Sequence, residues 1–305
     1  MRIQVLGSAA GGGFPQWNCN CANCGGFRRG TVRATSRTQS SIALSQDGED
    51  WLLVNASPDV LTQIAQTAAL QPGRSTRDSR IKAVLLMDAQ IDHVTGLLML
   101  RERDSPLPIM ATEEVFSDLG SGFPITAILS HYCGVDPVTL PLDGPAPAID
   151  GMPEIGLQAI ALESKPPPYS PHRSRPRIGD NIGLLITNRL SGARAFYAPG
   201  LATVSPVLLE HMATCQVVMV DGTFWTNDEM SRQGLSRKSA LDMGHLPQSG
   251  EGGMITQLSR LPGHVRKVLI HINNTNPILI EDSAERRELD DHGIEVAFDG
   301  MALSL

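Results

Sequence analysis

Short apolar runs alternate with polar segments rich in glycine or proline along the chain, which is the pattern of a mixed α/β protein. Residues 47–50, Asp-Gly-Glu-Asp, predict a hairpin, and Ser191-Gly192 predicts a second one. The runs typical of strands lie at 2–7, 40–45, 51–56, 81–87, 182–187, 195–198, 217–220, 268–272 and 294–298, and stretches that could be strand or helix lie at 107–110, 126–132 and 157–162.

Helix signals follow several of these runs. Ser57-Pro58 is typical of a helix cap and a first-turn proline, so a helix is expected from there to just before Pro72. Leu97 begins another helical stretch, and helices are predicted at about 205–214 and 283–291. Hairpins followed by strand–helix units in both halves are compatible with a pseudo-duplicated αββα sandwich. We expect one domain over residues 1–305.

The composition excludes several classes of protein. Apolar residues at 41% and charged residues at 19% fit a globular chain. A net charge of −7 argues against a nucleic-acid surface, and no apolar run approaches the roughly 18–20 residues of a membrane span. The start of the chain resembles a strand and shows no signal peptide, and the five cysteines do not form a disulfide framework. We therefore expect a cytoplasmic protein without nucleic-acid or membrane partners, with a homodimer left open.

The most informative polar segment comes directly after the apolar run at 81–87. Asp92 and His93 lie at a strand-to-helix corner, with Gly96 three residues on. A carboxylate oxygen and an imidazole nitrogen suit a borderline divalent cation, so the pair is a candidate for two metal ligands. The alternative is an aspartate that caps the helix and a histidine that packs beside it.

A second candidate metal site is the C-x-C-x-x-C cluster of Cys19, Cys21 and Cys24. Three thiolates satisfy most of a tetrahedral zinc shell, and such sulfur-rich shells are typical of structural zinc. Three unrelated buried thiols are the alternative, which we disfavour because closely spaced free cysteines are reactive. The fourth ligand must come from elsewhere in the chain.

Motifs spread from residue 5 to residue 301 resemble the coenzyme PQQ synthesis protein B family of the metallo-β-lactamase superfamily. They are VLGSAAGGGFPQWNCNCANC, RTQSSIAL, NASPD, QIDHVTGLL, PPYSPHR, GDNIGL, FYAPGL, DGTFW, MGHL, HINNTNPIL and EVAFDGM. The resemblance implies an αββα sandwich of the metallo-β-lactamase type, with the zinc-binding cysteine cluster near its N-terminus.

The resemblance also indicates which ligands of the superfamily are kept. Asp88 and Gln90 stand where the first two histidines of the H-x-H-x-D-H signature are expected, whereas Asp92, His93 and His271 survive. Two imidazoles and one carboxylate are the ligands of non-haem Fe(II) oxygenases, which predicts Fe(II) at the active site. Zinc binds the same set, and a degenerate member that only binds a ligand would look similar.

Several other polar residues are candidates through the same resemblance. His245 is expected to transfer protons, or else to cap a loop. Asp221 is expected to support a metal-bound histidine or to approach the metal. Asn274 stands where related phosphodiesterases carry a further histidine, and it is a candidate for the fourth zinc ligand.

The candidates for substrate contact come from three segments. Asp88 and Gln90 would line the pocket or hold a metal-bound water. Asparagines 273, 274 and 276 would orient His271 and contact substrate, or serve as turn residues. The long loop at 163–177 is either functional or a rigid surface excursion. Its basic residues would meet substrate carboxylates or remain solvated; these are His172, Arg173 and Arg175.

The family resemblance implies a role in the biosynthesis of pyrroloquinoline quinone (PQQ). The first hypothesis is an Fe(II)-dependent oxygenase that hydroxylates the tyrosine ring of the cross-linked Glu-Tyr intermediate, a small diamino acid. The second is a non-enzymatic carrier of PQQ or a precursor that assists its release or transport. The third is a hydrolase, by analogy of fold alone, and the missing histidines count against it.

Overall fold

The computed structural model describes residues 1–142 and 144–305. The chain forms two compact units. The first unit comprises Met1–Gly7, Ser40–Arg194 and Gly300–Leu305, and the second comprises Ser8–Gln39 and Ala195–Asp299. Each unit contains its own sheet strands and its own candidate site residues, and the two are described in turn.

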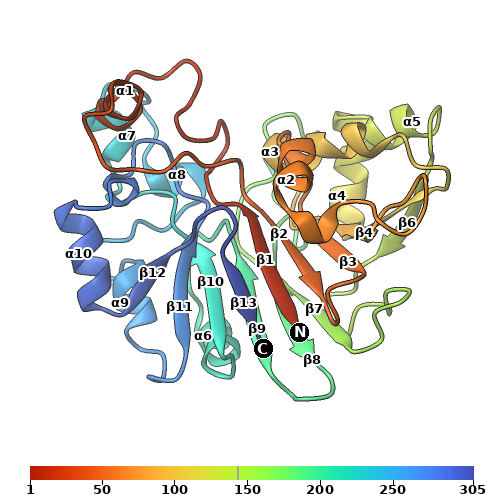
Figure 1. Cartoon of the computed structure of the whole chain (residues 1–305). Helices are drawn as coiled ribbons and strands as arrows, with labels where there is room; N and C mark the ends of the chain where they lie inside the picture. Colours follow the sequence, from red (N-terminus) through yellow and green to blue (C-terminus); the bar gives the residue numbers. More distant parts are fainter. Residues whose placement is uncertain (143) are drawn as a thin grey trace. The chain divides into compact units, whose positions relative to one another are not determined.

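The first unit is built on a mixed sheet with the strand order β13-β1-β2-β3-β4-β5-β6 (Figure 1). Strands β13, β1, β2 and β3 pair in antiparallel fashion, and β3, β4, β5 and β6 pair in parallel. Their bounds are β1 Arg2–Gly7, β2 Ser41–Ser45, β3 Trp51–Val54, β4 Ile81–Leu85, β5 Leu107–Ala111, β6 Val135–Thr139 and β13 Ala302–Ser304. The hairpin predicted around residues 47–50 is confirmed as β2 and β3.

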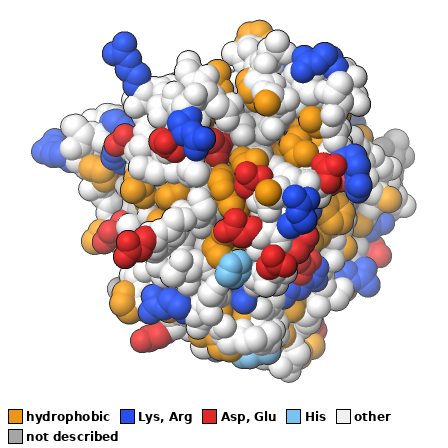
Figure 2. Space-filling view, turned by 90° about the vertical axis from the view of Figure 1, so that its left-hand side faces the viewer, with side chains coloured by type: hydrophobic (Ala, Val, Ile, Leu, Met, Phe, Trp, Pro, Cys, Tyr) orange, Lys and Arg blue, Asp and Glu red, His pale blue; other side chains and the backbone are white. Residues whose placement is uncertain are grey.

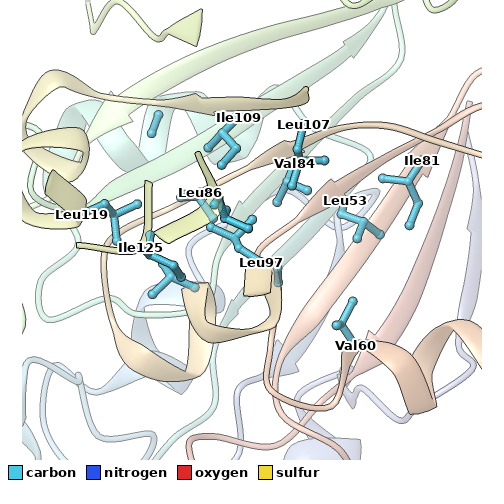
Figure 3. Close-up of a cluster of buried hydrophobic side chains, with 14 of the residues drawn as sticks. Leu53, Val60, Ile81, Val84, Leu86, Leu97, Leu107, Ile109, Leu119 and Ile125 are labelled. Atoms are coloured by element: carbon cyan, nitrogen blue, oxygen red, sulfur yellow. The ribbon is translucent and has the colours of Figure 1, made fainter. Parts of the chain in front are cut away.

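Short helices and a further strand pair complete this unit. Strands β7 (Ile155–Ala161) and β8 (Ile182–Asn188) are antiparallel. The helical segments are α2 Val60–Gln66, η1 Ala68–Leu70, α3 Ile91–Val94, η2 Thr95–Leu100, α4 Glu113–Ser117, η3 Asp118–Gly122 and α5 Ile125–Leu129. Apolar side chains from the sheet and from these helices meet in one core, which includes Leu53, Leu86, Leu97 and Ile109 (Figure 3). Ala89, Val94 and Leu97 belong to this core, so the segment that carries Asp92 and His93 packs against it on both sides of the pair.

Two predicted helix starts differ from the structure, by two residues at Pro58 and by six at Leu97. Helix α2 begins at Val60 and not at Ser57, because Ser57 forms a turn in which its carbonyl accepts the Val60 N–H. The helical stretch expected from Leu97 begins earlier, at Ile91, and continues as the 3₁₀ segment η2. Asp92 and His93 therefore lie inside the short helix α3 and not before it.

The second unit contains a parallel sheet in the order β12-β11-β10-β9 (Figure 1). Parallel strands are covered on both faces, and accordingly β10 is buried along its whole length. The strands are β9 Arg194–Ala198, β10 Val217–Asp221, β11 Arg266–Ile270 and β12 Ile294–Val296; the helices are α1 Ala22–Arg29, α6 Pro206–Ala213, α7 Glu229–Arg232, α8 Ala240–Met243, α9 Met254–Leu258, η4 Pro277–Leu279 and α10 Ala284–Asp291.

Caps explain where the predicted helices of this unit begin. The side chain of Ser205 accepts the Leu208 N–H at the start of α6, and that of Ser283 accepts the Arg286 N–H at the start of α10. The strand predicted over 268–272 ends at Ile270, so His271 follows β11 and is not part of it. Asp221 ends β10, so the two residues lie at the same carboxyl edge of parallel strands.

Acidic and basic side chains are interspersed on the molecular face drawn in Figure 2, with apolar side chains between them. Among the described residues, each helix is too short or too polar to cross a bilayer.

Candidate metal centre

The Asp92–His93 pair is held at the end of β4 by backbone contacts. The His93 carbonyl accepts the Ala56 N–H at 2.7 Å, and the Ala56 carbonyl accepts the Gly96 N–H at 2.9 Å. A side chain at Gly96 does not fit, because its Cβ would lie 2.1 Å from the Ser57 carbonyl oxygen. The glycine in the motif therefore permits the close approach that fixes α3 against residues 56 and 57.

Asp88 orients the ring of His93. The Asp88 Oδ1 atom accepts the His93 Nδ1–H at 2.8 Å and the Gln90 N–H at 2.8 Å. Burial alone would lower the pKa of His93, but the charges of Asp88 and Asp92 and the hydrogen bond to Asp88 outweigh it and raise the pKa to about 9. Because Nδ1 carries the bonded proton, coordination of a metal by this ring would use Nε2. That atom lies 3.8 Å from Asp92 Oδ2.

The second unit holds four polar side chains at the carboxyl edge of its sheet. Asp221 Oδ2 accepts the His245 Nδ1–H at 2.6 Å. The Thr223 hydroxyl donates to the His271 carbonyl at 2.9 Å, so it accepts from the His271 Nδ1–H, also at 2.9 Å. Thr223 Oγ1 is in addition 3.1 Å from His245 Nδ1. Both rings are thus fixed in the tautomer whose coordinating or basic nitrogen is Nε2.

These contacts bring several predicted residues together within the second unit. The two rings stack with centroids 5.5 Å apart, and Asp221, His245 and His271 offer ligand atoms within 4.8 Å of one another. Asp221 is fully buried and also accepts the Leu201 N–H and the Thr223 N–H. Its carboxylate therefore supports His245 and the turn after β10 by direct hydrogen bonds.

The three cysteines of the N-terminal motif converge as the spacing predicts. The Sγ atoms of Cys19, Cys21 and Cys24 are within 4.8 Å of one another. Burial and the neighbouring Cys24 and Cys19 charges raise the pKa of Cys21 to about 11. Burial also works to raise the pKa of Cys19, but hydrogen bonds from Cys21, Cys24 and Asn274 lower it below its usual value. A cation would relieve the repulsion among these thiolates, so the donor set fits a thiophilic metal such as zinc.

Asn274 lies against this cysteine cluster. Its Nδ2 atom is 3.1 Å from Cys19 Sγ and 3.4 Å from Cys24 Sγ. A side-chain amide can present either its nitrogen or its oxygen in this position. Its role as the fourth ligand stays a prediction, and its place beside the thiols supports it.

The side chains of Asn273 and Asn276, in the same loop, hydrogen-bond to neighbouring groups of the chain. Asn273 donates to Thr275 Oγ1 at 2.5 Å and is nearly buried. Asn276 is completely buried and donates to the carbonyls of Gly222 and Thr223. Substrate contact by these two residues stays a prediction, whereas their role in fixing the loop is visible in the contacts.

The 163–177 loop is anchored by polar contacts within the first unit. Tyr169 donates its hydroxyl proton to the Ala89 carbonyl, next to Asp88. His172 is buried, with Nε2 2.7 Å from Asp180 Oδ1 and Nδ1 3.6 Å from Asp118 Oδ1. Arg173 is half-buried and Arg175 exposed. The imidazole of His172 thus has two carboxylate partners of its own, and its contact with substrate stays a prediction.

Thr223, Tyr169 and Glu229 were not assigned a role from the sequence. Thr223 stands in the quoted DGTFW motif, but nothing in a single sequence shows that its hydroxyl reaches two histidines more than 20 residues away. Glu229 is buried beside the loop that follows His271 and accepts the Thr275 hydroxyl. Burial raises the pKa of Glu229 to about 7, although hydrogen bonds from Thr275 and Trp225 oppose the shift.

Comparison with known proteins identifies the fold and the family. A model of the beta-lactamase superfamily domain matches residues 50–272. The chain is 63% identical to the coenzyme PQQ synthesis protein B of Cupriavidus necator over 99% of both chains, and 58% identical to that of an Azoarcus species over the full length of both.

Solved structures agree with this. The crystal structure of Zn²⁺-bound PqqB from Methylobacterium extorquens matches with a TM-score of 0.89 and 37% identity over all of both chains. A diphosphatase of the PhnP family shares the fold, with a TM-score of 0.68 and 16% identity over 99% of this chain and 97% of that one. The chain therefore has the two-sheet metallo-β-lactamase fold and belongs to the coenzyme PQQ synthesis protein B family.

Proposed function

We propose that this chain acts in PQQ biosynthesis as an Fe(II)-dependent oxygenase that hydroxylates the tyrosine ring of the cross-linked Glu-Tyr intermediate. The role in the pathway rests on full-length relatives at 63% and 58% identity that bear the name coenzyme PQQ synthesis protein B. The proposed iron ligands are Asp92, His93 and His271. Bound ferrous iron with this ligand set supplies the activation of dioxygen.

The observation that carries the proposal is the hydrogen bond from His93 Nδ1 to Asp88. Asp88 stands where a hydrolase of the superfamily would have its first metal-binding histidine. In this chain its Oδ1 atom instead accepts from His93 and from the Gln90 backbone. A carboxylate that orients one metal-binding histidine supports a single-ion centre better than a two-metal hydrolytic centre.

The chain's other polar groups have roles that follow from their contacts. The ring of His245, fixed through Nδ1 by Asp221, would accept or donate a proton at Nε2 during ring hydroxylation. The buried carboxylate of Asp221 holds that ring in place through this hydrogen bond. Arg173 and Arg175 remain the candidates to meet the carboxylates of the diamino-acid substrate.

The test is oxygen consumption by anaerobically prepared protein loaded with Fe(II). Each ring hydroxylation consumes one O₂, two electrons and two protons and releases one water, so the assay supplies ascorbate as reductant. We expect oxygen uptake and a hydroxylated diamino acid by mass spectrometry, and neither with Zn²⁺-loaded protein. His271→Ala should abolish uptake, whereas His211→Ala, a histidine on α6 without motif support, should not.

The carrier hypothesis predicts a different result in the same assay. Tight binding of finished PQQ by the Fe(II)-loaded protein, with no oxygen uptake and no change in the diamino acid, would replace the oxygenase proposal by a carrier. The Zn²⁺-bound relative leaves the identity of the catalytic metal open to this test. Cleavage of a peptide or ester substrate by the Zn²⁺ form would support a hydrolase instead.

A further inference from the structure

His271 adopts a backbone conformation that its surroundings must impose. Its φ angle is +62°, in the left-handed region that a residue with a Cβ rarely occupies. Such a conformation persists only where neighbouring contacts over-determine it. The direction in which the ring points is therefore set by whatever holds the loop that begins at His271.

Asn276 holds the far end of this loop against the turn after β10. Its Nδ2 atom donates to the Gly222 carbonyl at 3.0 Å and to the Thr223 carbonyl at 3.3 Å, while its Oδ1 accepts the Ile278 N–H. Thr223 is also the residue whose hydroxyl contacts His271 at both Nδ1 and the carbonyl oxygen. Asn276 thus fixes the loop to the partner that orients the ring.

Asn23 connects the same loop to the cysteine cluster. It lies in α1, directly before Cys24, and is 8% exposed. Its Nδ2 atom donates to the Asn274 carbonyl at 3.1 Å and to the Asn276 carbonyl at 2.9 Å. One amide group therefore ties the helix that carries a cysteine to the loop that starts at His271.

The side chain of Asn274 adds a direct contact, because its Nδ2 lies 3.1 Å from Cys19 Sγ. The route from the cysteine cluster to His271 is thus continuous. It passes from Cys24 through Asn23 to the carbonyls of residues 274 and 276, then through the Asn276 side chain to Thr223 and the ring.

We propose that Asn23 and Asn276 are positioning residues through which the cysteine cluster sets the orientation of His271. A metal bound by the three cysteines fixes α1 and, through Asn23, the 273–276 loop, so it raises the affinity of the His271 centre for its own metal. The inference rests on the proposed function only in taking His271 as a metal ligand; it does not depend on the reaction catalysed. Because coupling between sites is reciprocal, a metal at His271 raises the affinity of the cysteine cluster by the same factor.

Co²⁺ is a suitable probe because its visible absorption spectrum differs between the cysteine cluster and the His271 centre. Thiolate-bound Co²⁺ gives intense sulfur-to-metal charge-transfer bands, whereas Co²⁺ held by imidazole and carboxylate gives only weak visible bands. Titration of the metal-free full-length chain therefore reports both affinities in one experiment. The weak bands should disappear in His271→Ala, which assigns them.

We expect Asn23→Ala and Asn276→Ala to weaken Co²⁺ binding at the His271 centre by about tenfold and to alter its visible bands. Asn18→Ala is the matched control, since this exposed asparagine of the same segment accepts a hydrogen bond from Gln16 and should leave both sites unchanged. A purely structural role would lower the thermal midpoint without altering the visible bands. The side chain of Asn276 hydrogen-bonds to backbone groups and not to the thiols. The Asn276→Ala variant therefore keeps the test valid even if Asn23→Ala also disturbs the cysteine cluster.

Wild-type affinity and unchanged bands at the His271 centre in both variants would overturn the coupling. If wild type binds Co²⁺ at both centres and only the coupling is absent, this inference fails and the proposed ligand set stands. If the wild-type chain shows no Co²⁺ bands that depend on His271, both fail together.

Discussion

Thr223 Oγ1 lies 2.9 Å from both the Nδ1 atom and the carbonyl oxygen of His271. A hydroxyl has one proton, and the carbonyl can only accept, so Thr223 donates to the carbonyl and accepts from the ring. The contact therefore fixes the tautomer of His271 as well as its orientation. Asp88 likewise orients the ring of His93, and Asp221 that of His245, each through Nδ1.

Thr223→Val should weaken metal binding that depends on His271. Valine keeps the shape of threonine but cannot accept the Nδ1 proton, so the ring loses its fixed tautomer. We expect metal affinity to fall at least about tenfold by competitive titration with a chelating dye. Thr223→Ser retains the hydroxyl and should bind as wild type does. Equal loss in the serine and valine variants would mean that packing, not the hydrogen bond, matters.

The affinity of the metal centre should depend on pH through His93. With a pKa of about 9, the ring is protonated at neutral pH in the metal-free chain. Each metal bound there must displace one proton, so apparent affinity should rise about tenfold per pH unit until about pH 9 and then level off.

Asp88→Asn tests this cause. Without the charge of Asp88 the pKa of His93 falls, so the plateau should begin at a lower pH. The plateau affinity itself should drop about tenfold, because an amide orients the ring less firmly than a carboxylate does. Metal titrations across the pH range measure both effects, and an unchanged profile in the variant would rule out this role of Asp88.

The buried Glu229 should make stability fall as the pH rises. Its pKa is raised from 4.5 to about 7, so its contribution is fully present below about pH 4.5 and is lost as the pH passes through 7. The shift corresponds to about 3 kcal/mol of unfolding free energy across this window. Urea unfolding at several pH values should show that decline in wild type, and Glu229→Gln should flatten it. Parallel curves for the two proteins would contradict the assignment.

Gly96→Ala should displace the helix that carries Asp92 and His93. The added methyl group would meet the Ser57 carbonyl oxygen at 2.1 Å, so the backbone of α3 must shift. We expect a loss of about 1–3 kcal/mol in unfolding free energy and weaker metal binding. Gly120→Ala is the matched control, because a Cβ there meets nothing within 4 Å. Equal stability of the two variants would show that the close approach is not rigid.

Most of the strands and the cysteine cluster could be predicted because their signals are local, whereas β6 and β13 were not expected. Short apolar runs rich in β-branched residues mark β4 and β10. The three cysteines lie within six residues of one another in the chain, and their Sγ atoms lie close together in the structure. The family motif drew attention to Asp88, but as a residue that lines the pocket or holds a metal-bound water, and that role stays a prediction. Its actual partner was missed, because a hydrogen bond to a ring five residues away depends on the turn between them.

Helix boundaries and long-range polar contacts could not be predicted from the amino-acid sequence. Ser57-Pro58 carries the signature of a helix cap, but the turn it forms competes with helix initiation, so α2 starts at Val60. The contact between Asn23 and Asn276 spans 253 residues, and no local pattern encodes such a distance. The long-range contacts that hold the candidate ligands are therefore visible only in the folded structure.

The most direct test of the proposed centre is a count of iron in anaerobically reconstituted protein. We expect one Fe(II) per chain outside the cysteine cluster in wild type and in His211→Ala. In Asp92→Ala, His93→Ala and His271→Ala we expect that iron to be lost while zinc at the cysteines is retained. Full iron content in any of these three variants would contradict the assignment of that residue as a ligand of the redox metal.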